Sequence, residues 1–163
     1  MSLSKLTFYL CKWEHTHSQI TRTRKKVFMD EQHLPLNFLR HKDDEERYHV
    51  VAYDDLTGQP VGTGCIHDDG HIGRIAILKG WRETNSVAHV IVDYLMHVAR
   101  SLKVDRVWLN APVDSLDFYS YRDFYPMGEP FDYCGVPMQK LELWREVEDN
   151  NKIFKSSADI TYD

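Results

Sequence analysis

The spacing of hydrophobic residues changes along the chain, and each change marks a predicted element. Short stretches rich in aromatic and β-branched residues predict strands, whereas apolar residues three and four positions apart predict helices. The clearest helix runs from Val87 to Lys103, where apolar residues recur on one face. The other predicted helices are 15–32 and 114–121, and the predicted strands are 6–13, 49–53, 61–67, 72–78, 106–110 and 138–144.

Two of these strands are joined by a short turn. Residues 68–71 read Asp-Asp-Gly-His, and an Asp-Gly pair between two apolar runs is a strong signal for a β-hairpin.

The order of the elements predicts an α+β protein with a mixed sheet. A length of 163 residues suits one domain, which we place at 1–144. A polar tail follows at 145–163, and its docking on the domain or on a partner chain is left open.

Composition and charge exclude several classes of protein. The formal net charge is -5, and the densest basic stretch, Arg22 to Lys26, is followed at once by acidic residues. Nucleic-acid binding normally needs a positive surface, so we exclude it. No apolar run has the length of a membrane span, and the first residues lack the apolar core of a secretory signal.

The cysteine pattern agrees with a protein of the reducing cytoplasm. Cys11, Cys65 and Cys134 are odd in number and far apart. They form neither a disulfide framework nor a metal-binding spacing. We therefore expect a cytoplasmic protein without a bound metal.

A first candidate site lies where the strand at 72–78 leads to the helix that follows it. The free N–H groups of a helix N-terminus suit a phosphate. Glycine usually allows the anion to approach, but no glycine follows Gly80 in this loop. Taken alone, the segment is explained as a capped helix start, with Thr84, Asn85 or Ser86 as the N-cap.

A second candidate site follows the strand at 106–110. The helix predicted after it contains Tyr119, which a short connection would bring close to the end of the strand. A tyrosine in an aromatic-rich chain usually serves packing. Taken alone, this segment too has a structural explanation.

Taken in order, the segments resemble the GNAT superfamily of acyl-CoA-dependent N-acyltransferases, most closely its ElaA-like branch. Residues 27–35 (Val-Phe-Met-Asp-Glu-Gln-His-Leu-Pro) resemble the branch's Val-Phe-x-x-Glu-Gln-x-x-Pro, and 72–78 resemble its Ile-Gly-Arg-Val-Ala-Val strand. The similarity extends from about Thr21 to Leu143. Its further matches are Asp44, His49, 61–63, 118–119, 128–131 and 135–137.

The resemblance implies a mixed, mostly antiparallel sheet that is splayed between the strands at 74–78 and 106–110, with helices on both faces. The pantetheine of acetyl-CoA would lie in the gap and hydrogen-bond to the first strand as an added strand does. The pyrophosphate would bind the N–H groups of 82–87. The residues implied to bind the cofactor are Ile75, Ile77, Leu78, Arg82, Glu83, Thr84, Asn85, Ser86, Val87 and Asn110.

The implied reaction is transfer of an acetyl group from acetyl-CoA to a primary amine by direct attack. Glu31 and His49 are alternative candidates for the base that deprotonates the amine. An N–H group near Ile77 would polarise the thioester carbonyl, and Tyr119 would protonate the departing thiolate. The acceptor is a small molecule or a peptide, and a homodimer is left open.

The sequence also departs from the family in its pyrophosphate loop. The family pattern is Arg/Gln-x-x-Gly-x-Gly/Ala, whereas here Arg82 is kept and Asn85 and Val87 replace the glycines. We expect Val87 to place a branched side chain where the phosphate approaches. We expect Glu83, next to Arg82, to add a negative charge that repels the phosphate. The departures leave an alternative hypothesis, a catalytically inactive GNAT-fold protein that binds a partner or retains CoA without turnover.

Overall fold

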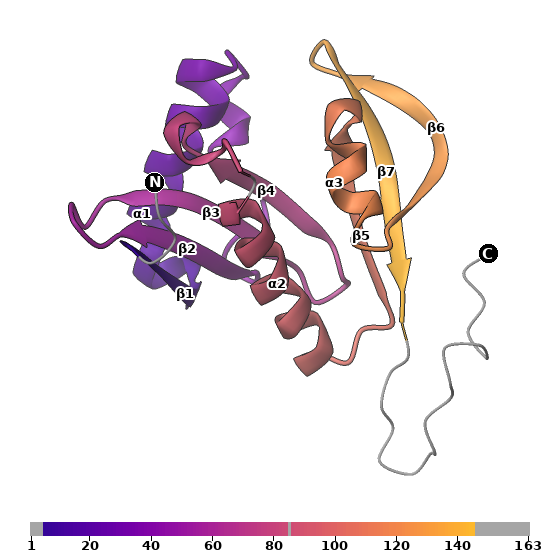
Figure 1. Cartoon of the computed structure of the whole chain (residues 1–163), viewed down its shortest axis with the longest axis horizontal. Helices are drawn as coiled ribbons and strands as arrows, with labels where there is room; N and C mark the ends of the chain where they lie inside the picture. The colour runs from indigo at the N-terminus through magenta and orange to yellow at the C-terminus, as the bar shows by residue number, and fades with distance from the viewer. Residues whose placement is uncertain (1–4, 85, 146–163) are drawn as a thin grey trace. The chain divides into compact units, whose positions relative to one another are not determined.

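The computed structural model describes residues 5–84 and 86–145, so that Asn85 and the tail from 146 onward lie outside the described residues. The contacts group the chain into two compact units. The first unit contains the chain up to His67 together with 72–98, and the second contains 68–71 and the chain from Ala99. Figure 1 draws the elements of both units, and each unit is described by itself.

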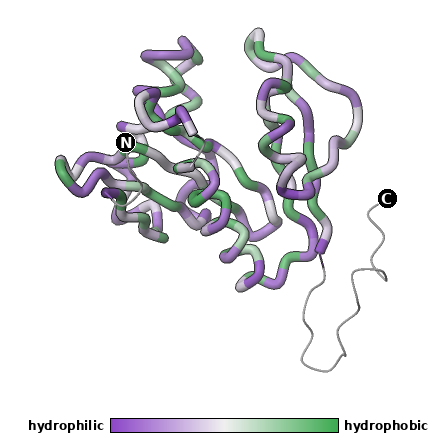
Figure 2. The backbone as a smooth tube through the Cα atoms, viewed as in Figure 1, coloured by the Kyte–Doolittle hydropathy of each residue, from purple (hydrophilic) through white to green (hydrophobic). Residues whose placement is uncertain are grey.

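The first unit is built on a four-stranded antiparallel sheet. Its strands are β1 (Leu6–Lys12), β2 (Tyr48–Asp54), β3 (Pro60–Ile66) and β4 (Ile72–Ile77), hydrogen-bonded in the order β1-β2-β3-β4. All four strands were predicted as short stretches rich in aromatic and β-branched residues, within one or two residues at each end. Figure 2 shows hydrophobic and hydrophilic segments alternating along this part of the chain.

Two helical segments cover opposite faces of this sheet (Figure 1). On one face lies α1 (Trp13–Arg24), which continues as a π-helical segment, η2 (Lys25–Glu31). On the other face lies α2 (Ser86–Ser101). The register explains this arrangement, because successive residues of a strand point to opposite faces: Cys65 contacts Arg24 of α1, whereas its neighbour Gly64 faces α2.

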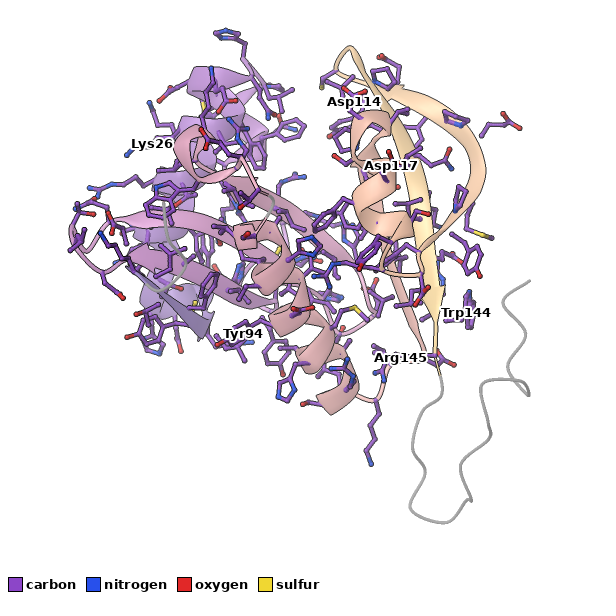
Figure 3. The ribbon with its side chains drawn as sticks, viewed as in Figure 1. Lys26, Tyr94, Asp114, Asp117, Trp144 and Arg145 are labelled. Atoms are coloured by element: carbon purple, nitrogen blue, oxygen red, sulfur yellow. The ribbon has the colours of Figure 1, made fainter. Side chains whose placement is uncertain are left out.

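The packing of α2 against β3 depends on two glycines. A Cβ added to Gly64 would lie 2.9 Å from Cγ2 of Ile91, and one added to Gly62 would lie 3.2 Å from Cγ1 of Val87. At the other edge of the sheet, the ring of Phe8 stacks on that of Tyr94 at 6.0 Å; Figure 3 labels Tyr94. The glycines therefore leave room for the side chains of Val87 and Ile91 to pack directly against the strand.

The second unit contains a three-stranded antiparallel sheet and a short helix. The sheet order is β5-β7-β6, with β5 (Arg106–Pro112), β6 (Tyr125–Tyr133) and β7 (Val136–Trp144). A 3-10 turn, η5 (Val113–Ser115), leads from β5 to α3 (Leu116–Ser120). Figure 3 labels Asp114 and Asp117 on this segment.

The sequence did not predict β6, and its composition explains why. Pro126, Gly128 and Pro130 interrupt the strand, and proline and glycine normally argue against a strand interior. All nine of its residues are exposed, so the strand has no hydrophobic alternation. Its pairing with β7 is irregular between Met127 and Phe131, where the buried Gln139 side chain donates to the carbonyls of Met127 and Gly128 at 3.0 and 3.2 Å.

The predicted hairpin at 68–71 is confirmed, and its glycine has a second role. Gly70 has a left-handed φ of 92°, and its carbonyl accepts a hydrogen bond from the amide of Trp108 at 3.0 Å. A Cβ at Gly70 would lie only 2.0 Å from the carbonyl oxygen of Arg106. Only glycine therefore fits where the turn meets β5.

The predicted fold class is confirmed, because the protein combines antiparallel sheets with helices on both faces of the larger one. The expected opening between the strands at 74–78 and 106–110 involves both units and stays a prediction. The expectation that residues 1–144 form a single domain also stays a prediction. Within residues 5–84 and 86–145, no helix is both long enough and apolar enough to cross a membrane.

We predict that Gly64→Ala destabilises the protein by about 1–3 kcal/mol, because the new methyl group collides with Ile91 in a packed interface. Urea unfolding measures the loss as a lower midpoint at constant slope. Gly80→Ala is the matched control, since a Cβ there meets open space. Equal free energies of unfolding for the two variants would show that the close approach of α2 to β3 is not required.

Candidate functional site

The edge of β4 that does not pair with β3 carries backbone groups that can bind an extended ligand. Leu78 donates its amide to the carbonyl of Val61 at 2.9 Å, and Ile77 lies opposite Gly62. Because N–H and C=O groups alternate between the two edges of an antiparallel strand, those of Ile77 point away from β3. An amide-containing ligand could hydrogen-bond to this edge as an added strand does.

Leu78 was predicted to bind the cofactor, but its backbone is already engaged. Its N–H donates to Val61, and its carbonyl accepts a hydrogen bond from the amide of Trp81 at 2.9 Å. Its side chain packs against the buried cluster of Val27, Phe28, Phe38 and Ala76. A ligand therefore finds no free amide donor at Leu78.

A β-bulge lies in β4, close to this edge. Thr63 pairs with Ala76 and Cys65 pairs with Gly73, so Arg74 and Ile75 together oppose a single residue of β3. Arg74 has a left-handed φ of 50°, and its guanidinium lies 4.8 Å from the ring centroid of Phe38. A bulge bends its strand and redirects a side chain, and here it directs Arg74 to the side of the sheet that α1 covers.

The loop after β4 leads through a 3-10 turn, η4 (Lys79–Trp81), to the N-terminus of α2. The first N–H groups of a helix have no partners within the helix, and the helix dipole favours an anion there. The hydroxyls of Thr84 and Ser86 lie 2.7 Å apart. Glu83 is exposed, so solvent screens its charge. Asn85, the remaining predicted contact of this loop, lies outside the described residues.

The expectation that Val87 obstructs a phosphate is wrong. Its side chain is only 2% exposed and points to the sheet, where Cγ1 would meet a Cβ on Gly62 at 3.2 Å. The expectation failed because Val87 belongs to the first turn of α2 and begins the apolar face of that helix. The sequence of the loop alone did not show to which face of the helix Val87 would point. The residue that replaces a family glycine therefore contributes to the core.

Glu31 and Arg82, which were predicted for different roles, form an ion pair with each other. Oε2 of Glu31 accepts a hydrogen bond from Nη2 of Arg82 at 2.5 Å. Their side chains are 33% and 32% exposed. The contact links the last residue of η2 to the loop that precedes α2, and a small ligand can reach both side chains.

His49, the other candidate base, is fully buried. Its side chain has no exposed surface, and its Nε2 lies 2.8 Å from the carbonyl oxygen of Asp44. Its Nδ1 has no hydrogen-bond partner among the described residues. Burial lowers the pKa of His49 to about 4. A substrate amine has no access to this ring, so the prediction of His49 as the base is wrong, because strand β2 points the side chain into the interior.

The neighbours of His49 form a buried charge cluster. Arg24 donates two hydrogen bonds to Asp44, Nη1 to Oδ2 at 2.7 Å and Nη2 to Oδ1 at 3.0 Å, and neither side chain is exposed. Burial alone would raise the pKa of Asp44, but the hydrogen bonds from Arg24 hold it below its ordinary value. Removing either partner would leave a buried charge without compensation.

The same cluster has the residue types of a metal site. Ligand-type atoms of Asp44, His49 and Cys65 lie within 4.8 Å of one another. However, Arg24 already binds both carboxylate oxygens, and the sulfur of Cys65 lies 3.9 Å from Nη2 of Arg24 and 3.8 Å from Nη1 of Arg47. Two flanking guanidinium groups repel a metal cation. We therefore interpret the trio as part of the charge cluster.

In the second unit, Tyr119 lies on α3 and Asn110 on β5. Tyr119 is 8% exposed, and its ring makes edge contacts with Phe118 and Phe124 at 4.9 and 5.7 Å. Burial raises the pKa of its hydroxyl to about 12, so the group is protonated at neutral pH. Asn110 is exposed and pairs with Lys140 of β7.

The sequence did not indicate the position of Arg74 or the buried pair of Arg24 and Asp44. Arg24 was counted in a basic stretch, whose ordinary explanation is a solvated helix face. Asp44 and His49 were noted as matches to the family, and this was the available signal for the cluster. Nothing in the sequence indicated the bulge at Arg74, because arginine rarely adopts a left-handed backbone conformation.

Comparison with known families gives one match, which spans both units. Residues 14–144 match a family model described as an acetyltransferase (GNAT) domain. The match covers well over half of the chain. It includes β4, the loop before α2, and α3 with Tyr119.

Comparison with solved structures agrees with this match. An acyl-CoA N-acyltransferase from Pseudomonas aeruginosa is similar with a TM-score of 0.74 and 20% identity, over 84% of this chain and 98% of that one. ElaA from Escherichia coli is similar with a TM-score of 0.74 and 19% identity, over 84% of this chain and 98% of that one. At this level of identity, both similarities concern the fold.

We predict that His49 makes the protein sensitive to mild acid. Because the pKa of His49 is about 4 in the folded state and near 6.5 in the unfolded state, only the unfolded chain takes up a proton between these values. The free energy of unfolding therefore falls as pH decreases from about 6.5 to 4, by roughly 3 kcal/mol from this group. Chemical denaturation at a series of pH values measures the loss.

His49→Gln removes this titration, so its stability should depend less on pH over the same interval. His97→Gln, which replaces an exposed histidine of α2, is measured in parallel as a comparison. If the profiles of wild type and His49→Gln are parallel, His49 is not held in its neutral form.

Proposed function

Because the chain belongs to the GNAT acetyltransferase family, we propose that it transfers an acetyl group from acetyl-CoA to a primary amine. The observation that carries the proposal lies within the first unit. There the outward backbone groups of Ile77 are followed, after a short loop, by the N-terminus of α2. An edge strand suits the amides of pantetheine, and a helix N-terminus suits a pyrophosphate.

The residues around these two features fit an acyl-CoA. Arg82 supplies a guanidinium that can form paired hydrogen bonds with phosphate oxygens, and Ser86 adds a hydroxyl at the start of α2. Val87 is buried against the sheet and does not obstruct the first turn. Glu83 remains an unfavourable charge, although its exposure weakens the repulsion.

When bound, acetyl-CoA supplies an acetyl group activated as a thioester. The N–H of Ile77 would donate to the thioester carbonyl and stabilise the charge that develops on its oxygen. Glu31 would accept a proton from the amine, because its carboxylate is one-third exposed whereas His49 is buried. Tyr119 would donate its proton to the sulfur as the carbon–sulfur bond breaks and the bond between nitrogen and the acetyl carbon remains. The nitrogen, which still carries one proton more than the amide product, would release that proton to solvent, and the tyrosinate would take a proton back from solvent.

The acceptor belongs to the class of small-molecule or peptide amines. A primary amine with a pKa of about 10.4 is protonated at neutral pH. It must therefore lose a proton before it attacks, which is why the reaction needs a base.

We predict that the protein binds acetyl-CoA and acetylates at least one amine, and that Tyr119→Phe lowers kcat about 10- to 1000-fold, the scale of losing a general acid. The variant keeps the ring and its contacts with Phe118 and Phe124, so affinity for acetyl-CoA should change little. Calorimetric titration measures binding, and CoA release with a panel of amines and peptides measures turnover.

Tyr121→Phe is the matched control, because Tyr121 directly follows the last residue of the same helix and is 84% exposed. Its turnover should equal that of wild type. Equal rates for all three proteins would remove Tyr119 from the mechanism. Binding without turnover on any acceptor would instead favour the alternative of a GNAT-fold binding protein.

A further inference from the structure

We infer that the ion pair between Glu31 and Arg82 is a switch that releases the base only after the phosphates of the acyl-CoA have bound. The inference rests on the proposed acetyltransferase function and adds an order of events to it. In the structure described here, Glu31 holds Arg82. In the complex, Arg82 would turn to the phosphates and free the Glu31 carboxylate for the amine.

The position of Glu31 is fixed by its own segment. Glu31 is the last residue of η2, whose Val27 and Phe28 are buried in the cluster that also receives Ala76 of β4 and the side chain of Leu78. The chain after it is held by hydrogen bonds from Gln32 to Val27 and from Leu34 to Phe28, at 3.1 and 2.7 Å. The end of η2 is therefore attached to the C-terminal end of β4.

This attachment matters because the outward N–H of Ile77 lies on the same end of β4. A thioester carbonyl bound by Ile77 would be near the end of η2, and an amine attacking that carbonyl would approach the same region. Glu31 is thus on the element best placed to receive the proton of the amine.

Arg82 is the part of the pair that can change partners. It follows η4 and precedes α2, where a phosphate would bind, and about a third of its side chain is exposed. A guanidinium can form two parallel hydrogen bonds with phosphate oxygens, and a pyrophosphate carries more negative charge than one carboxylate. A bound phosphate at the N-terminus of α2 would therefore compete successfully with Glu31.

Release of Glu31 changes what its carboxylate can do. In the pair, Oε2 accepts a hydrogen bond from Arg82, so an amine would have to displace a guanidinium to reach it. Once released, Oε2 can take one proton from the ammonium group: an N–H bond breaks, an O–H bond forms, and the neutral amine attacks the thioester. The carboxyl group then returns the proton to solvent.

A permanent structural role for the pair predicts different results. If Glu31 only holds Arg82 in the binding position, its loss weakens acetyl-CoA binding and lowers thermal stability. If the pair is a switch, its loss removes a competitor of the phosphate and strengthens binding, while turnover falls. The two roles therefore differ in the sign of the effect on affinity.

The test measures both quantities on Glu31→Gln, which keeps the shape of the side chain and removes its charge. We expect its Kd for acetyl-CoA to fall about two- to fivefold, the scale of a partly exposed ion pair. We expect its kcat to fall about 100-fold or more, the scale of losing a general base. Calorimetry and amine acetylation give the two values.

Two further variants complete the design. Asp30→Asn removes a neighbouring charge that pairs with Lys25 at 3.0 Å in the same segment, and it should change neither value. In an Arg82→Gln background, Glu31→Gln should no longer strengthen binding, because the competitor and its partner are both gone. This double-mutant cycle isolates the coupling between the two residues.

The outcomes separate this inference from the proposed function. A wild-type protein that does not bind acetyl-CoA, or acetylates no amine, overturns both. A wild type that binds and acetylates, combined with unchanged or weaker acetyl-CoA binding by Glu31→Gln, overturns the switch alone. Stronger binding with unaltered kcat removes Glu31 as the base and overturns the switch as well.

Discussion

The close approach of α2 to β3 is the constraint on which the candidate site depends. Gly62 and Gly64 have no side chains on the face of β3 that α2 covers, so Val87 and Ile91 pack directly on the strand at these positions. Val87 is in the first turn of the helix. This contact therefore brings the N-terminus of α2 to the end of β3 that pairs with Ile77, and joins the two features that suit an acyl-CoA.

On the opposite face of the same sheet, α1 is held by polar interactions among buried side chains. There α1 is anchored by a buried ion pair, Arg24 with Asp44, beside the neutral ring of His49 and the thiol of Cys65. Such a pair contributes little net stability but is costly to break. It fixes the orientation of α1, which continues into η2 and ends at Glu31. A buried cluster far from solvent thus determines where a partly exposed carboxylate lies.

The sequence predicted most of the elements because their patterns are local. The apolar face of the helix at 87–103 and the Asp-Gly turn at 68–71 each depend on neighbouring residues. The exposed strand β6 was missed because prolines and glycine mask it. The bulge at Arg74 depends on pairing between strands, which a local pattern does not record.

The candidate site was predicted less completely, for a related reason. The resemblance located β4 and the loop before α2, and it suggested Glu31 and Arg82 individually. It did not show that the two side chains meet, because 51 positions separate them in the chain. It also did not show which way Val87 and His49 point, because orientation depends on the phase of the helix and the strand. Both side chains turned out to be buried.

The central claim is that acetyl-CoA binds along the edge of β4 that does not pair with β3. Amide hydrogen exchange of Ile77 and Leu78, followed by NMR with and without saturating acetyl-CoA, tests it most directly. The account predicts that exchange at Ile77 slows when the ligand accepts its hydrogen bond, whereas Leu78, which already donates to Val61, changes little. Unchanged exchange at Ile77 in a protein saturated with acetyl-CoA would contradict the claim.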